Sequence, residues 1–196
     1  MSSLQFTVTS ASGSSGNVGL AEIVVSYSQP QTPILKGNET NSTVVATPAP
    51  TFDWSTDLAL NATARASTSS PNQGPEKAIN AAPGGFTYAG GSYLDEWASA
   101  GEQAGAWIKL NWDYGITVNQ VVLYDRPNVN DQITGGTLRF DNGLIIQTGA
   151  LANDGSAVNI SVPSINTTSI FFTITSVSST TTNVGLSEFA VFGSIK

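Results

Sequence analysis

Short runs of β-branched and aromatic residues, separated by Gly, Asn and Asp, recur from about Asp57 to the end of the chain. Examples are AWIKLNW (106–112), ITVNQVVLYD (116–125), GTLRFDNG (136–143) and SIFFTITSV (169–177). Short strands spaced by turns, with little helical periodicity, predict an all-β antiparallel sandwich or jelly roll. The segment FDNG (140–143) predicts a hairpin with a type I′ turn, because Asn-Gly tolerates positive φ angles.

The run AWIKLNW alternates in the way expected of a strand with one buried face. Trp107 shares a face with Lys109 and Asn111, whereas the intervening apolar residues share the other. We therefore expect the core to include Ile108, Leu110, Val121 and Leu123. A large aromatic residue in such a strand more often packs than binds, so Trp107 is not counted among the candidate ligand contacts.

One signature occurs twice, as FTVTSASGSSGNVGLAEIVV (6–25) and FTITSVSSTTTNVGLSEFAV (172–191), at a constant offset of 166 positions. An ungapped match of this length indicates an internal repeat. Residues 29–56 lie between the first copy and the strand-rich part, are rich in Pro and Thr, and predict an extended linker. We interpret residues 1–28 as the final hairpin of a preceding sister module, in a tandem arrangement, and residues 57–196 as one complete module.

An isolated hairpin is only marginally stable in water, because two strands cannot bury an apolar face. We therefore expect residues 5–27 to lie as β structure against an exposed sheet edge, of their own domain or of a neighbouring chain.

The composition excludes several classes of function. With no His and no Cys, the chain cannot hold a Ser-His-Asp triad, a His-ligated zinc or a thiolate nucleophile. The net charge is -7 and the seven Lys and Arg residues are scattered, which argues against nucleic acid and anionic lipid. No apolar run is long enough to predict membrane insertion, and MSSLQFTVTS (1–10) lacks the features of a signal peptide. The low charged fraction of 11% fits an extracellular or cell-surface module.

The segment LYDRPNVNDQITGG (123–136) leaves an apolar strand and at once presents planar hydrogen-bonding groups. Such groups can contact neighbouring hydroxyls of a sugar with rigid geometry. The candidate ligand contacts here are Asp125, Arg126, Asn128 and Asn130, with Arg126 expected to be exposed. The alternative is a polar loop whose Asp and Arg side chains pair with each other.

A second segment that could line the ligand site is GGFTYAGGSYLDEWAS (84–99), which is glycine-rich and irregular. Tyr88 and Tyr93 could stack on the apolar face of a pyranose. Asp95 and Glu96 add carboxylates, but neighbours on a strand point to opposite faces, which disfavours acid–base catalysis by this pair. Trp97 is expected to anchor the loop to the core.

Several ordered motifs resemble the discoidin, or coagulation factor V/VIII type C, family of galactose-binding-like domains. The motifs are ATARAST (62–68), EKAIN (76–80), EWAS (96–99), AWIKLNW (106–112), ITVNQVVLYDRP (116–127) and VGLSEFAVFG (184–193). Within that family the chain is most similar to family 32 carbohydrate-binding modules. The resemblance implies an eight-stranded jelly roll with ligand loops at one end and no catalytic activity.

The same resemblance implies roles for particular residues. In the relatives, the strand matching VVLYDRP ends in an Arg or His that grips the sugar, and a loop Asp or Asn follows, which points to Arg126, Asn128 and Asn130. Relatives also place a sugar-contacting polar residue where Asp95 and Glu96 stand.

The resemblance further implies a structural Ca²⁺ site. In the relatives a Glu of the last strand closes this site, and Glu188 matches it. Asn80 stands where an Asp is usual, and a neutral amide lowers the affinity for calcium.

The sequence thus favours a non-catalytic, lectin-like module that targets a parent protein to glycans. The alternative is a protein-adhesion or spacer domain of a multidomain extracellular protein.

Overall fold

The computed structural model describes residues 56–81 and 94–196. The chain divides into two compact units, Met1–Thr47 and Pro48–Lys196, and all described residues belong to the second unit. Several predictions therefore lie outside the described residues: the hairpin at 1–28, nearly all of the linker at 29–56, the edge contact at 5–27, Tyr88 and Tyr93.

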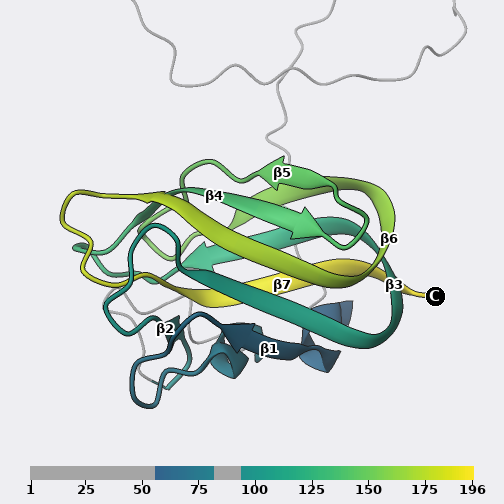
Figure 1. Ribbon diagram of the computed structural model, residues 1–196, viewed down its shortest axis with the longest axis horizontal. Helices are drawn as coiled ribbons and strands as arrows, with labels where there is room; N and C mark the ends of the chain where they lie inside the picture. Colours follow the sequence, from purple (N-terminus) through teal and green to yellow (C-terminus); the bar gives the residue numbers. More distant parts are fainter. Residues whose placement is uncertain (1–55, 82–93) are drawn as a thin grey trace, which may run out of the picture. The chain divides into compact units, whose positions relative to one another are not determined.

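The described residues form seven strands and two short 3₁₀ helices. In chain order these are η2 (Leu58–Asn61), β1 (Thr63–Ala66), η3 (Pro75–Ile79), β2 (Trp97–Ala98), β3 (Trp107–Asp125), β4 (Ile133–Phe140), β5 (Ile145–Gln147), β6 (Val158–Val177) and β7 (Gly185–Ile195). Every strand pairing is antiparallel, in the order β2-β7-β3-β6-β4-β5, with β1 on β3. The predicted all-β antiparallel sandwich is confirmed (Figure 1).

The two longest strands, β3 and β6, run together through both layers of the sandwich. Residues 107–111 of β3 lie between β1 and β6, whereas residues 116–123 lie between β6 and β7. The register of the β3–β6 pair shifts between Asn111 and Ile116, and the strands turn the corner there. The described residues thus form seven strands, whereas the resemblance implied eight, and each long strand contributes to both layers.

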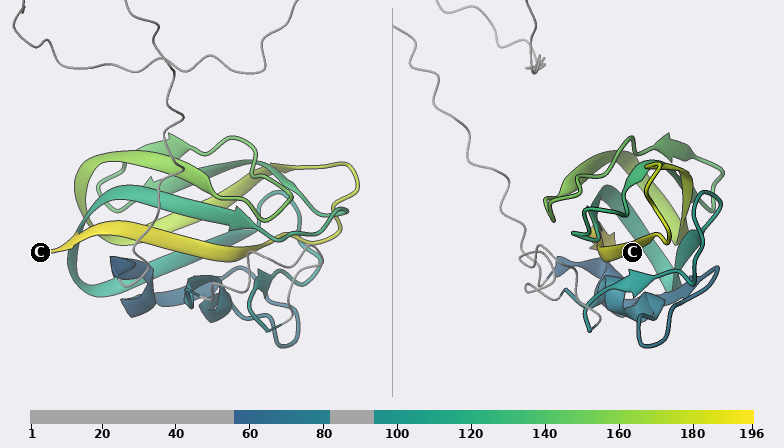
Figure 2. Two further views of the ribbon diagram at one scale, coloured as in Figure 1. Left: turned by 180° about the vertical axis from the view of Figure 1, so that it is seen from behind. Right: turned by 90° about the vertical axis from the view of Figure 1, so that its left-hand side faces the viewer.

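The core fills the space that these strands surround (Figure 2, right). The four predicted core residues, Ile108, Leu110, Val121 and Leu123, are all fully buried. Phe172 of β6 packs edge-to-face on Phe189 of β7, with ring centroids 6.3 Å apart. Trp97 is also fully buried and donates from Nε1 to the Thr68 carbonyl at 3.0 Å, so its predicted anchoring role is confirmed. Within the described residues, no helix is long and apolar enough to cross a membrane.

The hairpin predicted at FDNG joins β4 to β5, but the predicted type I′ geometry is wrong. Gly143 has a φ of 88°, whereas Asn142 does not adopt a positive φ. The Gly143 N–H donates to the Phe140 carbonyl and the Phe140 N–H donates to the Leu144 carbonyl, both at 3.0 Å. This pattern is a three-residue loop with its glycine in the left-handed region, the next most common hairpin connection.

Asp57 fastens the start of the module to its last strand. Its Oδ1 accepts from the Ala59 N–H at 2.9 Å, which caps η2, and from the Val191 N–H of β7 at 2.8 Å. Its Oδ2 is buried and accepts no hydrogen bond from the described residues. Burial raises the pKa of the Asp57 carboxyl to about 6, although the two backbone hydrogen bonds oppose this change.

The raised pKa of Asp57 predicts that acid stabilises the module in one pH range. Between pH 3.8 and about 6 the folded state holds more protons than the unfolded state, so the free energy of unfolding falls as pH rises. The difference between the two pKa values corresponds to about 3 kcal/mol. In Asp57→Asn this titration is absent, so the slope of the unfolding free energy between pH 4 and 6 should be smaller. Urea unfolding at several pH values measures it.

The control is Asp113→Asn, which removes an exposed carboxylate and should keep the parent slope. A slope in Asp57→Asn equal to that of the parent would contradict the assignment of the raised pKa to Asp57.

Candidate functional site

The candidate site lies at the end of the sandwich away from the C terminus (Figure 1). There β3 ends at Asp125 and β7 begins at Gly185, and β7 lies between β3 and β2. Leu186 of β7 is the register partner of both Asp125 and Trp97, so three elements distant in sequence meet at one point. The loops at 94–96, 126–132 and 178–184 leave from this end.

Arg126 is the centre of a buried polar cluster and is only 7% exposed. Its Nε donates to Glu96 Oε1 at 3.0 Å, and its Nη1 donates to Asn183 Oδ1 at 3.2 Å. Nη1 also lies 3.6 Å from Asp131 Oδ2. The expectation of an exposed arginine is wrong, because two carboxylates draw the guanidinium under the loops. The alternative interpretation of the sequence, a polar loop whose Asp and Arg side chains pair with each other, agrees with the contact between Arg126 and Asp131.

Asp125 closes the loop that follows it. Its Oδ1 accepts from the Arg126 N–H at 2.9 Å and its Oδ2 accepts from the Ile133 N–H at 2.8 Å. Burial raises the pKa of the Asp125 carboxyl to about 7, and the two hydrogen bonds and the Arg126 charge oppose this. These two hydrogen bonds hold the ends of the loop together. The side chain is only 2% exposed, so it is turned away from solvent.

Asn128 and Asn130 sit in the same loop with different exposures. Asn128 is half-buried, and its Nδ2 donates to Asp131 Oδ2 at 3.0 Å. Asn130 is exposed, its N–H donates to Asn128 Oδ1 at 3.0 Å, and its carbonyl accepts from Thr180 Oγ1 at 2.8 Å. The Asn130 amide group is therefore presented to solvent by a loop that is fixed through its backbone.

Asp131 is the residue that the sequence-based selection of contacts missed. Besides its contacts with Arg126 and Asn128, its Oδ1 accepts from the N–H of Thr182 at 2.7 Å and from Thr182 Oγ1 at 3.2 Å. These bonds tie the loop after β3 to the loop before β7. A sequence signal exists for the second loop, because Asn183 belongs to the repeated signature.

Glu96 joins the third loop to this cluster. It is 2% exposed and accepts at Oε1 from Gln73 Nε2 at 2.8 Å as well as from Arg126. Asp95, the other carboxylate predicted here, is half-buried.

Gly185 allows the close packing on which the cluster depends. A Cβ at this position would lie 1.9 Å from the Trp97 carbonyl oxygen and 2.6 Å from Arg126 Cδ. Any side chain would therefore push β7 away from β2 and from the arginine.

The two residues predicted to ligate calcium are placed differently. Glu188 is fully buried in β7, opposite Tyr124 of β3 in the register, and its carboxylate has the hard oxygen atoms that Ca²⁺ prefers. Asn80 is exposed and caps the C-terminal end of η3. The described residues contain no group of three or more His, Cys, Asp or Glu that could hold a metal ion. Glu188 and Asn80 alone cannot supply the roughly six to eight oxygen atoms that Ca²⁺ takes as ligands. The segment that follows Ala81 in the chain lies outside the described residues.

Comparisons with known proteins agree with this architecture. No protein with a curated description matches the chain. The family 32 carbohydrate-binding module of C. perfringens NanJ, solved with galactose, has a TM-score of 0.55 and 15% identity, covering 69% of this chain and 97% of that one. Chitosan-binding module 2 of a Paenibacillus sp. IK-5 chitosanase/glucanase, solved with chitotriose, has a TM-score of 0.54 and 20% identity, covering 70% and 100%.

A fucolectin from striped bass (Morone saxatilis) serum has a TM-score of 0.54 and 16% identity, covering 70% of this chain and 47% of that one. At these identities the likeness shows a shared fold, and it confirms the antiparallel β-sandwich that the sequence predicts.

The model of one protein family matches residues 57–192, which lie within the predicted module at 57–196. Since this match spans more than half of the 196 residues, the chain belongs to the family described as "Domain of unknown function (DUF7402)".

Proposed function

We propose that this chain is a non-catalytic, lectin-like module of an extracellular protein, and that it binds glycans through the loops beside Arg126. Three solved structures with the same fold are a galactose-bound module, a chitotriose-bound module and a fucolectin, which supports a sugar as the ligand. Fold alone does not define a function, so the proposal depends on the chemistry of the loop end.

The observation that carries the proposal is the way Arg126 is held. Its Nε and Nη1 are engaged by Glu96, Asn183 and Asp131, whereas Nη2 has no hydrogen-bond partner among the described residues. A guanidinium fixed on one side keeps its geometry and offers the remaining donors to a ligand without a further loss of side-chain freedom.

The neighbouring loop supplies complementary groups for a neutral sugar. The exposed Asn130 amide can donate and accept, which suits a hydroxyl that does both. Val129, 82% exposed, lies between the two asparagines and offers an apolar surface for the C–H face of a pyranose. We further propose that Tyr88, Tyr93 and Asp95, from the segment 84–99, contact the same sugar.

Replacing Asn130 with Ala tests the ligand role without disturbing the fold. The described contacts of Asn130 run through its backbone, so the free energy of unfolding should change by less than about 0.5 kcal/mol. Loss of a hydrogen bond worth about 1 kcal/mol should weaken glycan binding about fivefold. Binding is measured by glycan array and then calorimetry, on neutral sugars that include galactose, fucose and chitotriose.

The matched control is Asn159→Ala, which removes an exposed asparagine from β6. Binding by the control should equal that of the parent. A full chain that binds no glycan on the array, or equal binding by Asn130→Ala and the parent, would contradict the proposal.

Arg126→Ala should act mainly on stability. It leaves the Glu96 and Asp131 carboxylates buried without their counter-charge, and breaking a buried ion pair from one side costs about 3–5 kcal/mol. Arg139→Ala removes an exposed arginine and should cost much less. Thermal and urea unfolding measure both, and an Arg126→Ala protein as stable as the parent would contradict the buried cluster.

An apolar protein partner is the alternative function, and a specific observation favours it. Leu94 and Val129, 73% and 82% exposed, stand in the two loops that the Glu96–Arg126 contact joins. An adhesion role predicts that Val129→Ser abolishes protein binding, whereas no glycan on the array is bound.

We also propose that Glu188 contributes to a structural calcium site together with Asn80. An ion that binds only the folded state stabilises it by mass action, so a chelator should lower the melting temperature of the parent. The chelator should have no effect on Glu188→Gln. An unchanged melting temperature of the parent with chelator would remove calcium from the proposal and leave the glycan site as it stands.

A further inference from the structure

The outward face of β1, β3, β6 and β4 carries one continuous row of charged and aromatic side chains. Arg65 is the register partner of Lys109, Lys109 is the partner of Phe171, and Phe171 is the partner of Arg139. Residues paired across strands point to the same face. Because neighbouring strands lie about 4.8 Å apart, the row extends about 14 Å across the four strands. We call these four residues, with Trp107, the cationic row.

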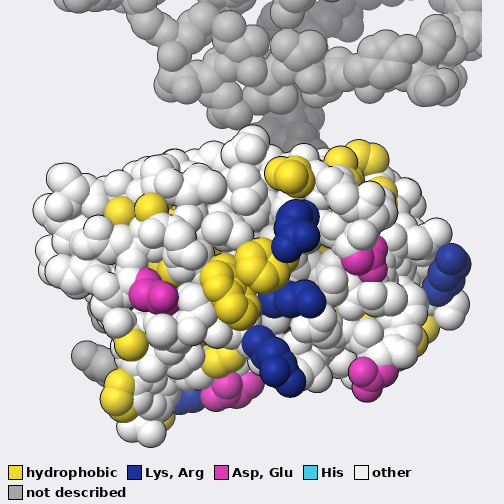
Figure 3. Space-filling view, viewed as in Figure 1, with side chains coloured by type: hydrophobic (Ala, Val, Ile, Leu, Met, Phe, Trp, Pro, Cys, Tyr) yellow, Lys and Arg dark blue, Asp and Glu magenta, His cyan; other side chains and the backbone are white. Residues whose placement is uncertain are grey.

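Stacked planar groups organise one half of this row. Trp107 stacks on Phe171 with ring centroids 4.9 Å apart and an interplanar angle of 25°. The Arg139 guanidinium carbon lies 5.1 Å from the Phe171 ring centroid, a cation–π contact. In the space-filling view, apolar and basic side chains lie next to one another in the middle of this face (Figure 3).

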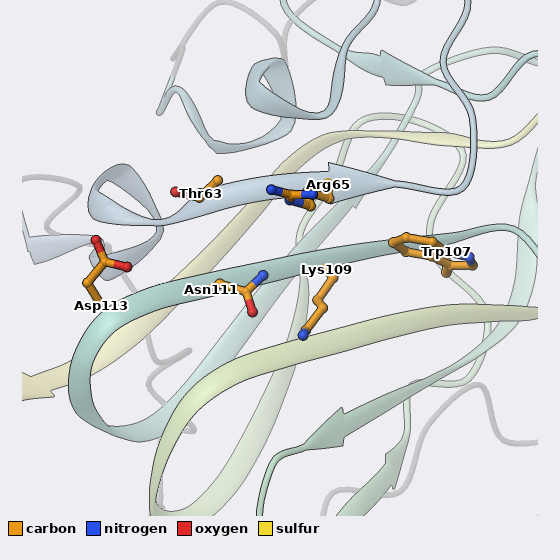
Figure 4. A pocket seen from close by; sticks show the side chains of 6 residues that line it. All are labelled: Thr63, Arg65, Trp107, Lys109, Asn111 and Asp113. Atoms are coloured by element: carbon orange, nitrogen blue, oxygen red, sulfur yellow. The ribbon is translucent and has the colours of Figure 1, made fainter.

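Two hollows flank the row. One of about 450 Å³ is lined by Thr63, Arg65, Trp107, Lys109, Asn111 and Asp113 (Figure 4). A second of about 230 Å³ shares Lys109 with it and includes Arg139 and Phe171. The two hollows together follow the row, and the hydroxyl groups of Thr63 and Ser169 and the amide of Asn111 line them beside the cations.

The charges of the row lack a carboxylate partner within the part of the chain that the structure describes. Among the described residues, the side-chain nitrogens of Arg65, Lys109 and Arg139 form no ion pair and no hydrogen bond, in contrast to those of Arg126. These three residues are a large share of the seven Lys and Arg in a chain whose net charge is -7. The expectation that the basic residues are scattered is therefore wrong for this face.

We propose that the cationic row is a second ligand site, distinct from the loop end, and that it binds an acidic polysaccharide. Carboxylate or sulfate groups along the polymer would pair with Arg65, Lys109 and Arg139, and a sugar ring would lie against Trp107. Both anionic groups present the oxygen atoms that Arg and Lys recognise.

The same features argue against a nucleic acid. A single strand carries a phosphate at every nucleotide and needs a groove with many cations. This face offers three, with Asp113 and Asp141 lining the two hollows, in a chain that is acidic as a whole. A polymer with more widely spaced charges matches three cations on a mostly neutral, hydroxyl-rich face.

The test uses the full chain and four polymers. Polygalacturonate and dextran sulfate supply the carboxylated and sulfated arms, and methyl-esterified polygalacturonate and plain dextran are their neutral counterparts. Affinity electrophoresis and calorimetry should show binding to at least one acidic polymer, weaker at higher salt because exposed charges are screened. Binding to one arm alone supports the site and identifies the anionic group.

Two variants with the same change in charge localise the binding. Arg65→Gln with Lys109→Gln removes two cations of the row, both on the surface, and should weaken binding of the acidic polymer tenfold or more. Lys77→Gln with Lys196→Gln removes two cations elsewhere and should leave it within about twofold. Indole fluorescence should change on binding in the parent, and this change should be lost in Trp107→Phe.

Three results would overturn the proposal. They are no binding to either acidic polymer, an equal loss in the two double variants, or tighter binding of single-stranded DNA than of the acidic polymers. A loss of acidic-polymer binding in Asn130→Ala, with none in the Arg65 and Lys109 double variant, would instead assign the acidic ligand to the loop end. The neutral-sugar array tests the loop site separately, so the two proposals can fail independently.

Discussion

The pairing of β3 with β6 is the constraint on which the rest of the structure depends. These strands stay paired from Trp107–Thr173 through the corner to Leu123–Val158, so one hydrogen-bonded ribbon belongs to both layers. Alternation along this ribbon sends Ile108, Leu110 and Phe172 into the core and Trp107, Lys109 and Phe171 to the outer face. The end of β3 also fixes where the loop after Asp125 begins. Both candidate surfaces are therefore positioned by the same pair of strands.

The loop end shows why a polar cluster can persist beneath a surface. Burying the Arg126 guanidinium is unfavourable unless carboxylates and amides surround it, and Glu96, Asp131 and Asn183 do so from three different loops. Three residues that the repeat shares are tightly constrained in this copy. Asn183 accepts a hydrogen bond from Arg126, Gly185 has no room for a Cβ, and Glu188 is fully buried. The interpretation of residues 6–25 as the matching segment of a sister module stays a prediction, because these residues lie outside the described part of the chain.

The sequence predicted those features that depend on local pattern. Alternation of period two identified Ile108 and Leu110 as core, and ordered motifs identified the sandwich, because both signals are contained within single strands. The burial of Arg126 was not predictable in this way, since Glu96 stands 30 positions away and meets it only through the packing of β2 on β7. The cationic row was missed for the same reason: Arg65, Lys109, Arg139 and Phe171 are distant in sequence and become neighbours only through strand register.

The two surfaces differ in how their charges are compensated, and this difference separates the ligands that each can accept. At the loop end the cation is already neutralised by Glu96 and Asp131, so a bound anion would meet a cluster with no net positive charge. A neutral sugar gains there from oriented hydrogen bonds, which have short range and little dependence on salt. On the outer face the three cations keep their charge unpaired within the described residues, so attraction acts over longer distances and favours an anion. Under the two proposals, the outer face of this acidic chain would attract acidic ligands, whereas the loop end would bind uncharged sugars.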